Sequence, residues 1–260
     1  MEVNKAFLSR NLGLLSEKQY HELAGKTVLI AGCGIGSVIA VGVARTGFHH
    51  IVLADGDVVE ESNLNRQEYS SDDLGQPKVE ALARRLKKLN RRIHVKEIGS
   101  FLDSSNISAA LEGIDVVVDA IDPLESPMAV VELHRQCKKM GLPVVYPVDI
   151  GWGGGIFIFT KDSKSLEEML EITESERGND SGLRDKFMAY YTGIIPEYLS
   201  PVLNDVIEGR LDNIPQPASA AYSTAALSVI AIKRLVLGLP VKKAPDFISF
   251  DPHILHLAGE

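Results

Sequence analysis

The sequence is poor in cysteine, has no long apolar run and carries no excess of positive charge. Its 260 residues include two cysteines, Cys33 and Cys137, too few for a disulfide framework or a four-cysteine zinc site. No segment offers the uncharged run that a membrane span needs, and the N-terminal segment lacks the apolar core of a signal peptide. With 27 basic against 35 acidic residues, the net charge of −8 disfavours nucleic acid and anionic membranes as partners. These absences predict a reduced, cytoplasmic protein without structural zinc.

Short apolar runs alternate with helical patterns through the first two thirds of the chain. Buried strands are expected at 27–31, 50–54, 93–98, 115–120 and 143–148. Helices are expected at 36–46, 77–90 and 124–140. Strands separated by helices favour right-handed crossovers. The sequence therefore predicts an α/β protein with a Rossmann-like, doubly wound and mostly parallel sheet.

The last third has a different pattern. A glycine-rich run at 151–159 suggests a strand entered through flexible glycines, which would extend the sheet in an antiparallel direction. A small-residue helix at 218–237 is expected to end at Gly238, and a final strand is expected at 244–251. The proposed division is a nucleotide-binding core at 1–160, a polar helical insertion or lid at 161–213, and a C-terminal helix and strand at 214–260 that complete the same domain.

A glycine-rich turn between the first strand and the first helix is the sharpest local signal. The turn contains Gly32, Gly34 and Gly36, and when it is read as G-x-G-x-x-G the third glycine position is taken by Ser37. Glycines let the backbone approach a ligand, and the helix that follows offers free N–H groups to phosphate. The turn by itself favours a nucleotide over a purely structural turn, but it does not distinguish NAD from ATP.

Acidic and basic residues follow the neighbouring strands. Asp55 and Asp57 lie about twenty residues beyond the glycine turn, where a carboxylate can accept hydrogen bonds from ribose hydroxyls. Arg66 and Lys78 can neutralise a triphosphate, and Asp122, after the strand at 115–120, can hold Mg²⁺ against it. Each residue alone is compatible with a capped turn or a solvated surface charge. As a set at the carboxyl ends of the strands, they favour nucleotide binding.

These motifs resemble the ThiF/MoeB/ubiquitin-activating-enzyme superfamily. The resemblance rests on Gly32–Ser37, the D-G-D of 55–57, S-N-L-N-R-Q at 62–67, G-Q-P-K at 75–78 and the aspartate of D-A-I-D at 122. It implies ATP- and Mg²⁺-dependent adenylation of a carboxylate, usually the C-terminus of a small carrier protein or peptide. The product is an acyl-adenylate, which a nucleophile consumes later.

The resemblance also assigns roles to individual residues. Asp55 would bind the ribose, whereas Asn63, Arg66, Gln67 and Lys78 would contact the phosphates, and Asp122 would hold Mg²⁺. Arg10 is similar to an arginine that reaches into the neighbouring subunit's site, which implies a homodimer. Such an arginine can stabilise charge that develops during phosphoryl chemistry.

The chain departs from the family pattern in several places. The glycine turn is one residue shorter than usual, and Pro123 follows Asp122 where the family has Asn and then Arg. Paired C-x-x-C motifs are missing, as is any cysteine after Cys137, so neither structural zinc nor a thioester cysteine is expected. We expect Cys33 and Cys137 to be packing residues. Two alternatives remain open, a non-catalytic nucleotide-binding relative and an NAD(P)-dependent oxidoreductase.

Overall fold

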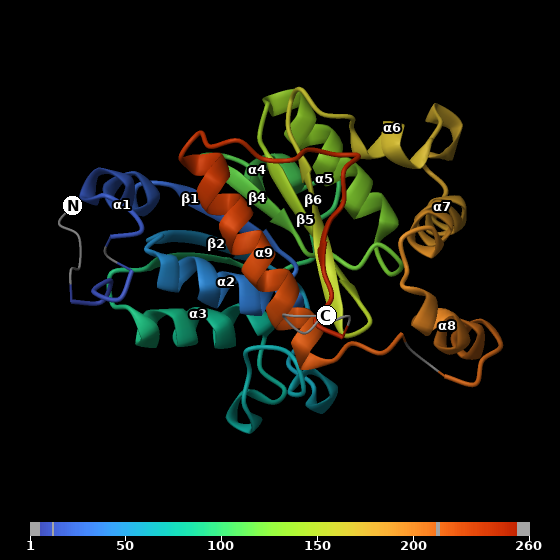
Figure 1. Ribbon diagram of the computed structural model, residues 1–260, viewed down its shortest axis with the longest axis horizontal. Coiled ribbons are helices and arrows are strands. Elements are labelled where there is room, and N and C mark those ends of the chain that lie inside the picture. The colour runs from blue at the N-terminus through green and yellow to red at the C-terminus, as the bar shows by residue number, and fades with distance from the viewer. Residues whose placement is uncertain (1–5, 12, 212–213, 254–260) are drawn as a thin grey trace, which may run out of the picture.

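One seven-stranded sheet organises the chain (Figure 1). The computed structural model describes residues 6–11, 13–211 and 214–253. The strands lie in the order β3-β2-β1-β4-β5-β6-β7. Their bounds are β1 Thr27–Ala31, β2 His50–Ala54, β3 His94–Ile98, β4 Val116–Asp119, β5 Val144–Ile150, β6 Gly153–Phe159 and β7 Ile248–Phe250.

The direction of the strands confirms the predicted doubly wound architecture. Strands β1 to β5 are parallel, whereas β6 pairs antiparallel with β5, and β7 antiparallel with β6. The chain builds outward from β1 through β2 to β3, then returns to place β4 and β5 on the other side of β1. The strand order therefore reverses between β1 and β4. In open α/β sheets, ligands bind outside the carboxyl ends of the strands at this point.

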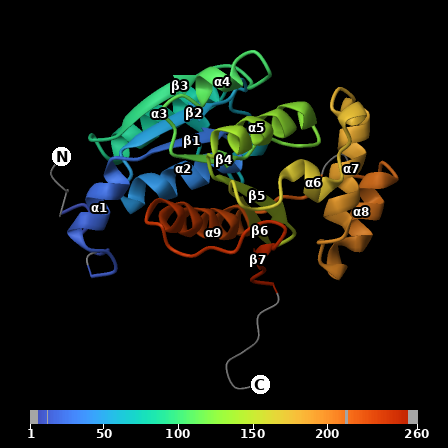
Figure 2. The same ribbon diagram turned by 90° about the horizontal axis from the view of Figure 1, so that it is seen from above.

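Helices cover both faces of the sheet (Figure 2). One face is covered by α2 (Ile35–Thr46), α3 (Lys78–Leu89) and α9 (Ala218–Val236), and α1 (Glu17–Ala24) adds to the same core. The other face is covered by α4 (Ile107–Ala110), α5 (Pro127–Met140), α6 (Leu166–Leu170) and α7 (Asp180–Thr192). Helix α8 is Ser200–Ile207, and short 3-10 helices lie at Glu61–Asn63, Ser71–Asp73, Glu174–Glu176 and Glu197–Leu199.

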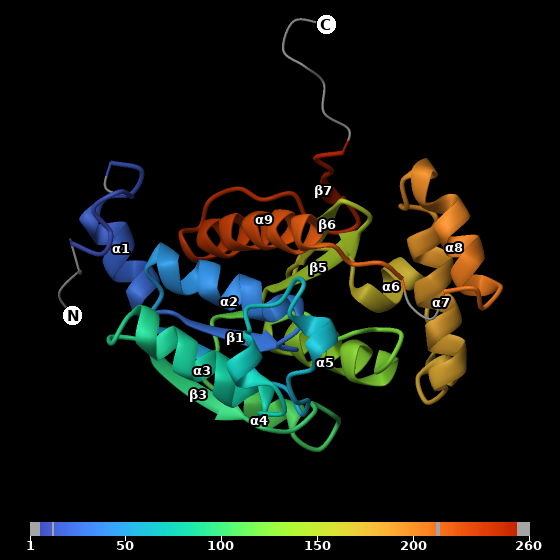
Figure 3. The ribbon, with the colours of Figure 1, turned by 90° about the horizontal axis from the view of Figure 1, so that it is seen from below.

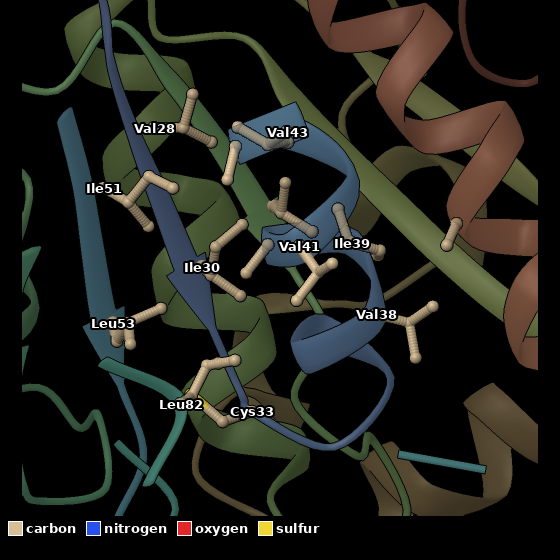
Figure 4. Packing of buried hydrophobic residues seen from close by; sticks show 14 of the residues in the cluster. Val28, Ile30, Cys33, Val38, Ile39, Val41, Val43, Ile51, Leu53 and Leu82 are labelled. Atoms are coloured by element: carbon tan, nitrogen blue, oxygen red, sulfur yellow. The ribbon is translucent and has the colours of Figure 1, made fainter. Parts of the chain in front are cut away.

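The central strand β1 is apolar throughout because both of its faces are covered. Val28 and Ile30 pack toward α2, as Figure 4 shows, whereas Leu29 and Ala31 belong to the cluster on the other face. All four side chains are fully buried. Burying each of the larger ones stabilises the fold by about 1.5–3 kcal/mol. This burial fixes the position of the strand whose end carries the glycine turn.

Strand β6 confirms the antiparallel extension, but its glycines have a different role from the one expected. Gly153, Gly154 and Gly155 lie within β6 itself and are fully paired in the sheet. A Cβ on Gly154 would lie 2.1 Å from Thr224 Oγ1 of α9, and one on Gly155 would lie 2.3 Å from the ring of Phe247. The glycines therefore allow α9 and the chain before β7 to approach the strand closely.

Several element boundaries differ from those expected. Helix α6 stops at Leu170 because Glu171 adopts a left-handed conformation, with φ 54°. Helix α7 lies within the predicted helical insertion at 161–213, and neither α1 nor α8 was predicted as a separate helix. The final strand is limited to Ile248–Phe250, and the chain before it turns, with the Asp246 N–H donating to the Lys243 carbonyl. None of the helices among the described residues is long and apolar enough to span a membrane.

Candidate functional site

The glycine turn connects β1 to α2 with no room for side chains. Gly32 has φ +85°, and a Cβ there would lie 2.3 Å from the Ala120 carbonyl oxygen. A Cβ on Gly36 would lie 2.7 Å from Ile30 Cγ2, so this glycine sets how closely α2 packs on β1. The N-terminus of α2 has no side-chain cap and no acidic residue in its first turn. Its backbone amides and the positive end of the helix dipole suit a phosphate group.

Asp55 attaches this turn to the end of β2. Its Oδ2 accepts a hydrogen bond from the Cys33 N–H at 2.6 Å, and its Oδ1 accepts one from the Asp57 N–H at 2.8 Å. The residue is 8% exposed. Each carboxylate oxygen has more than one lone pair, so Asp55 can still accept a ribose hydroxyl. It therefore both shapes the turn and faces the place where a nucleotide would lie.

A buried lysine, Lys78, pairs with Asp57, two residues after Asp55. Lys78 Nζ is 2.9 Å from Asp57 Oδ2, and the Lys78 side chain is 9% exposed. The Lys78 N–H also donates to the Asp57 carbonyl, which ties the start of α3 to the segment after β2. Tyr69, which the sequence reasoning missed, donates from its hydroxyl to the Cys33 carbonyl at 2.8 Å. Asp55 and Tyr69 thus both fix the backbone of the turn at Cys33, one at its N–H and the other at its carbonyl.

The segment 62–67 lies on the other side of the glycine turn. Asn63 is buried, and its Oδ1 accepts a hydrogen bond from the Glu60 N–H. The Gln67 side-chain amide lies against Gly34, and its buried Oε1 has no hydrogen-bond partner. The Arg66 guanidinium donates to the Ser62 carbonyl at 2.9 Å and to the Asn65 side chain. Of these three predicted residues, Gln67 borders the turn directly, whereas the hydrogen bonds of Asn63 and Arg66 lie within the segment 60–66.

Strand β4 ends in a group of carboxylates. Asp122 Oδ1 accepts a hydrogen bond from the Leu124 N–H at 2.8 Å. Burial raises the pKa of the nearby Glu125, and the negative charges of Asp122, Asp57 and Asp55 raise it further, whereas Lys78 opposes them. The predicted residues from β2, α3 and β4 are thus close enough to interact. This region therefore contains four carboxylates and one lysine, namely Asp55, Asp57, Asp122, Glu125 and Lys78.

This excess of negative charge fits a divalent cation. Oxygen donors are the ligands that Mg²⁺ prefers, and it is commonly held by one or two carboxylates together with substrate phosphates. Among the described residues, no group of three or more His, Cys, Asp or Glu side chains is placed to hold a metal ion by itself. Asp122 and Glu125 are the carboxylates after β4 with the chemistry for a shared site of that kind.

A buried pair supports the β4 turn and was not predicted. Asp119 is fully buried, and its Oδ2 lies 3.0 Å from His134 Nε2 of α5. Its Oδ1 accepts a hydrogen bond from the Ile121 N–H at 3.2 Å, one residue before Asp122. Burial raises the pKa of Asp119, and His134 opposes that shift. The pair orients the segment that carries Asp122.

A second acidic residue that sequence reasoning missed is Asp149, near the end of β5. Burial raises the pKa of Asp149 to about 7, although the nearby Thr224 hydroxyl and the positive charge of Arg66 act in the opposite direction. Its buried Oδ1 has no hydrogen-bond partner. The signal in the sequence is a charged residue inside the apolar run V-V-Y-P-V-D-I at 144–150.

Arg10 lies far from the site of its own chain. It is exposed, and its neighbours pack at the other end of α2, where Leu8 approaches Gly47 and Asn11 donates to the Arg45 carbonyl. Helix α2 has 12 residues, so it is about 18 Å long. The length of this helix therefore separates Arg10 from the glycine turn of its own chain.

Both cysteines are packing residues, as predicted. Cys33 and Cys137 are fully buried. Burial, and secondarily the charge of Asp55, raises the pKa of the Cys33 thiol, and burial raises that of Cys137 to about 12. A nucleophilic cysteine needs an exposed thiolate, which neither residue can supply.

The chain matches a known family and is similar to several known proteins. The ThiF family matches residues 8–235. The chain is 34% identical to the SAMP-activating enzyme E1 of Haloferax volcanii, over 58% of this chain and 52% of that protein. It is 32% identical to the molybdopterin-synthase adenylyltransferase of Escherichia coli, over 53% of this chain and 55% of that protein. It is 31% identical to the tRNA threonylcarbamoyladenosine dehydratase of E. coli, over 51% of this chain and 49% of that protein. The aligned region thus spans about half the length of these relatives.

Solved structures resemble the chain over nearly all of its length. The E. coli MccB structure with ATP has a TM-score of 0.69 at 20% identity and covers 97% of this chain and 70% of that one. The structure of PaaA has a TM-score of 0.67 at 20% identity and covers 95% of this chain and 80% of that one. At such identity the likeness shows a common fold.

Proposed function

Because the chain belongs to the ThiF family, we propose that it uses ATP and Mg²⁺ to adenylate a carboxylate, the C-terminus of a small carrier protein or peptide. The observation that carries the proposal is the grouping of Lys78, Asp57 and the carboxylates after β4 beside the uncapped N-terminus of α2. An NAD-binding site has no use for a buried lysine and a cation-binding carboxylate at this position. Net charge −8 favours a protein or peptide substrate over RNA.

Each residue group has a distinct task in this proposal. Asp55 accepts hydrogen bonds from the ribose, and the α2 amides with Lys78 take up phosphate charge. Arg66, Asn63 and Gln67 contact the phosphates from the other side of the turn. Asp122, with Glu125 beside it, would hold Mg²⁺, which when bound neutralises phosphate charge.

The reaction is a substitution at the α-phosphorus of ATP. A carboxylate oxygen of the substrate attacks that phosphorus, the bond to the bridging oxygen of the β-phosphate breaks, and pyrophosphate leaves. The acyl-adenylate then reacts with an external nucleophile, which displaces AMP. The burial of Cys33 and Cys137 supports a nucleophile other than a cysteine of this chain, such as a sulfur carrier, an amine or a side chain of the substrate peptide. Two unpaired, buried cysteines also suit the cytoplasm, where we place the reaction.

Arg10 completes the site from a second copy of the chain. Its position at the far end of α2 supports a role outside its own subunit's site. In a homodimer that places the two N-terminal segments near the opposite sites, the guanidinium can stabilise charge on the leaving pyrophosphate. We therefore propose a homodimer as the active form.

ATP–pyrophosphate exchange tests the proposal directly. Labelled pyrophosphate should enter ATP when the protein is given Mg²⁺ and candidate C-terminal peptides, and Lys78→Ala should abolish this exchange. Tight binding of NADH without binding of Mg·ATP would instead support an oxidoreductase. Binding of Mg·ATP without exchange for any carboxylate would support the non-catalytic relative suggested by the short glycine turn and Pro123.

A further inference from the structure

Three segments that are distant in sequence meet beside the glycine turn, on the side away from Asp55. They are the segment 62–67, the end of β5 with the turn after it, and the start of α9 (Figure 3). The Asn65 side-chain amide donates to the Gln216 carbonyl at 3.3 Å, and the Ser219 hydroxyl donates to the Trp152 carbonyl at 2.9 Å. These contacts surround Asp149, which the proposed adenylation steps do not use.

The Asp149 side chain points toward α9. Val148 and Ile150 pack on the α5 side of the sheet, so the alternation of side chains along β5 places Asp149 on the opposite face. Its partner across the strand pair is Gly154. Because Gly154 has no side chain, Thr224 of α9 reaches in beside the carboxylate. Asp149 and Thr224 thus form one buried polar contact region between β5, β6 and α9.

Neither side chain is satisfied within the protein. Asp149 Oδ1 and Thr224 Oγ1 are both buried, and neither has a hydrogen-bond partner. A buried polar atom without a partner is costly, and a buried carboxylate oxygen more so. Asp149 as a whole residue is only partly buried. A ligand that donates a hydrogen bond would remove this cost.

The order of residues along the sheet edge indicates which ligand this is. Asp55 ends β2, the glycine turn ends β1, and Asp122 follows β4, so a nucleotide fills the edge from β2 to β4. The next strand is β5, and Asp149 lies near its end. The group that reacts with the nucleotide therefore lies over β5, between Asp149 and Arg66, whose charge acts on that aspartate.

We propose that Asp149 accepts a hydrogen bond from the N–H group of the residue whose carboxylate is adenylated, so that the site selects peptide C-termini over simple carboxylic acids. Arg66 offsets the repulsion between Asp149 and the reacting carboxylate. The inference rests on the proposed adenylation and adds to it a rule for the substrate. A site that pairs a buried polar group with the substrate discriminates strongly against an analogue without that group.

The test compares two substrate pools that differ in one atom. One pool contains short peptides of random sequence, and in the matched pool the last amide N–H is replaced by an ester oxygen. A mixture of acetate, hexanoate and benzoate is the third probe. We expect the wild-type protein to catalyse pyrophosphate exchange about 10- to 100-fold faster with the amide pool than with the ester pool.

Variants separate recognition from a structural role. Asp149→Ala should bring the amide-to-ester ratio to near one, and Asp149→Asn, which keeps the shape of the side chain, should lower it at least several-fold. Asp162→Asn is the matched control, because it makes the same carboxylate-to-amide change on a side chain that is 65% exposed, and it should leave the ratio unchanged. A purely structural aspartate would change the rates with both pools equally.

The outcomes also distinguish this inference from the proposed function. Equal rates with both pools, an unchanged ratio in Asp149→Asn, or exchange with the simple acids alone would overturn the role of Asp149 and leave adenylation standing. If the protein binds Mg·ATP but exchanges pyrophosphate with none of the three probes, both the inference and the adenylation of peptides are wrong.

Discussion

Lys78 and Asp57 form an ion pair of 2.9 Å in which the lysine is almost entirely buried and the aspartate is half exposed. An ammonium held in this way has lost most of its water, and the ion pair fixes its position near the glycine turn that begins α2. A phosphate bound there would meet an ammonium whose position is already set.

Substitution of Lys78 should separate binding from folding. We expect Lys78→Met to weaken Mg·ATP binding by about 10- to 100-fold, because a charged hydrogen bond to phosphate is lost. Calorimetric titration measures this affinity. Lys87→Met is the control, since Lys87 pairs with Glu97 at 3.1 Å on the exposed side of α3 and such pairs contribute about 1 kcal/mol or less. An unchanged affinity in Lys78→Met would exclude a phosphate contact.

Asp122→Asn should remove adenylation while the fold remains intact. Asparagine can still accept the hydrogen bond from the Leu124 N–H, but it lacks the charge that a divalent cation needs. We expect pyrophosphate exchange to fall roughly 100- to 1000-fold, with a melting temperature within about 4 °C of the parent. Asp103→Asn is the matched control, because Asp103 makes the same kind of turn hydrogen bond, to the Ser105 N–H. Equal losses in both variants would argue against a metal role for Asp122.

The parts of the site that could be predicted from sequence are those set by neighbours along the chain. The bounds of β1 and β2 match the apolar runs because burial on both faces requires such runs. Asp55 and Lys78 were found because the turn after a strand and the start of a helix have local signals. The carboxyl ends of parallel strands then bring these residues together whatever the rest of the chain does.

Residues defined by contacts over long sequence distances could not be found in this way. Asp149 and Thr224 are 75 positions apart and meet only because Gly154 allows α9 to approach the sheet. Asp119 reads as the last residue of an apolar strand, and nothing local indicates its contact with His134. In each case the property that matters, a buried polar atom, depends on what packs against it.

Removing both thiols should leave the chemistry intact. Because Cys33 and Cys137 are fully buried, we expect neither to react with iodoacetamide in the folded protein. The double Cys→Ser variant should keep adenylate formation and complete turnover. Burying two hydroxyls should lower the free energy of unfolding by roughly 1–3 kcal/mol each. A reducible acyl-enzyme in the parent, seen by mass spectrometry and lost in the variant, would instead identify a cysteine nucleophile.

Arg10 should act only across a dimer interface. Arg10→Ala and Asp122→Asn should each be inactive alone. In a mixture, half of the dimers carry both chains, and one of their two sites then has an intact Asp122 together with Arg10 from the other chain. We therefore expect mixing to restore about a quarter of the wild-type exchange rate, given statistical exchange of subunits. Sedimentation should show a dimer throughout. Absence of restored activity in mixed dimers would rule out an arginine supplied in trans.

Protein stability should depend on pH through Asp149. Its pKa is raised by burial from 3.8 to about 7, with Arg66 and the Thr224 hydroxyl facing it and opposing the shift. Between these values the folded protein retains a proton that the unfolded chain has lost, so this contribution to stability is present at low pH and is lost as the pH rises toward 7.

Chemical denaturation of the wild-type protein and of Asp149→Asn at pH 5 and pH 8 measures this effect. The free energy of unfolding of the variant minus that of the wild type should be about 2–3 kcal/mol larger at pH 8 than at pH 5, because the wild type loses stability as Asp149 ionises and asparagine has no charge to bury. Asp162→Asn is the control, because the Asp162 side chain is 65% exposed. A difference that is the same at both pH values would mean that Asp149 ionises in the folded protein as readily as in the unfolded chain, and its carboxylate would then be well solvated or already paired.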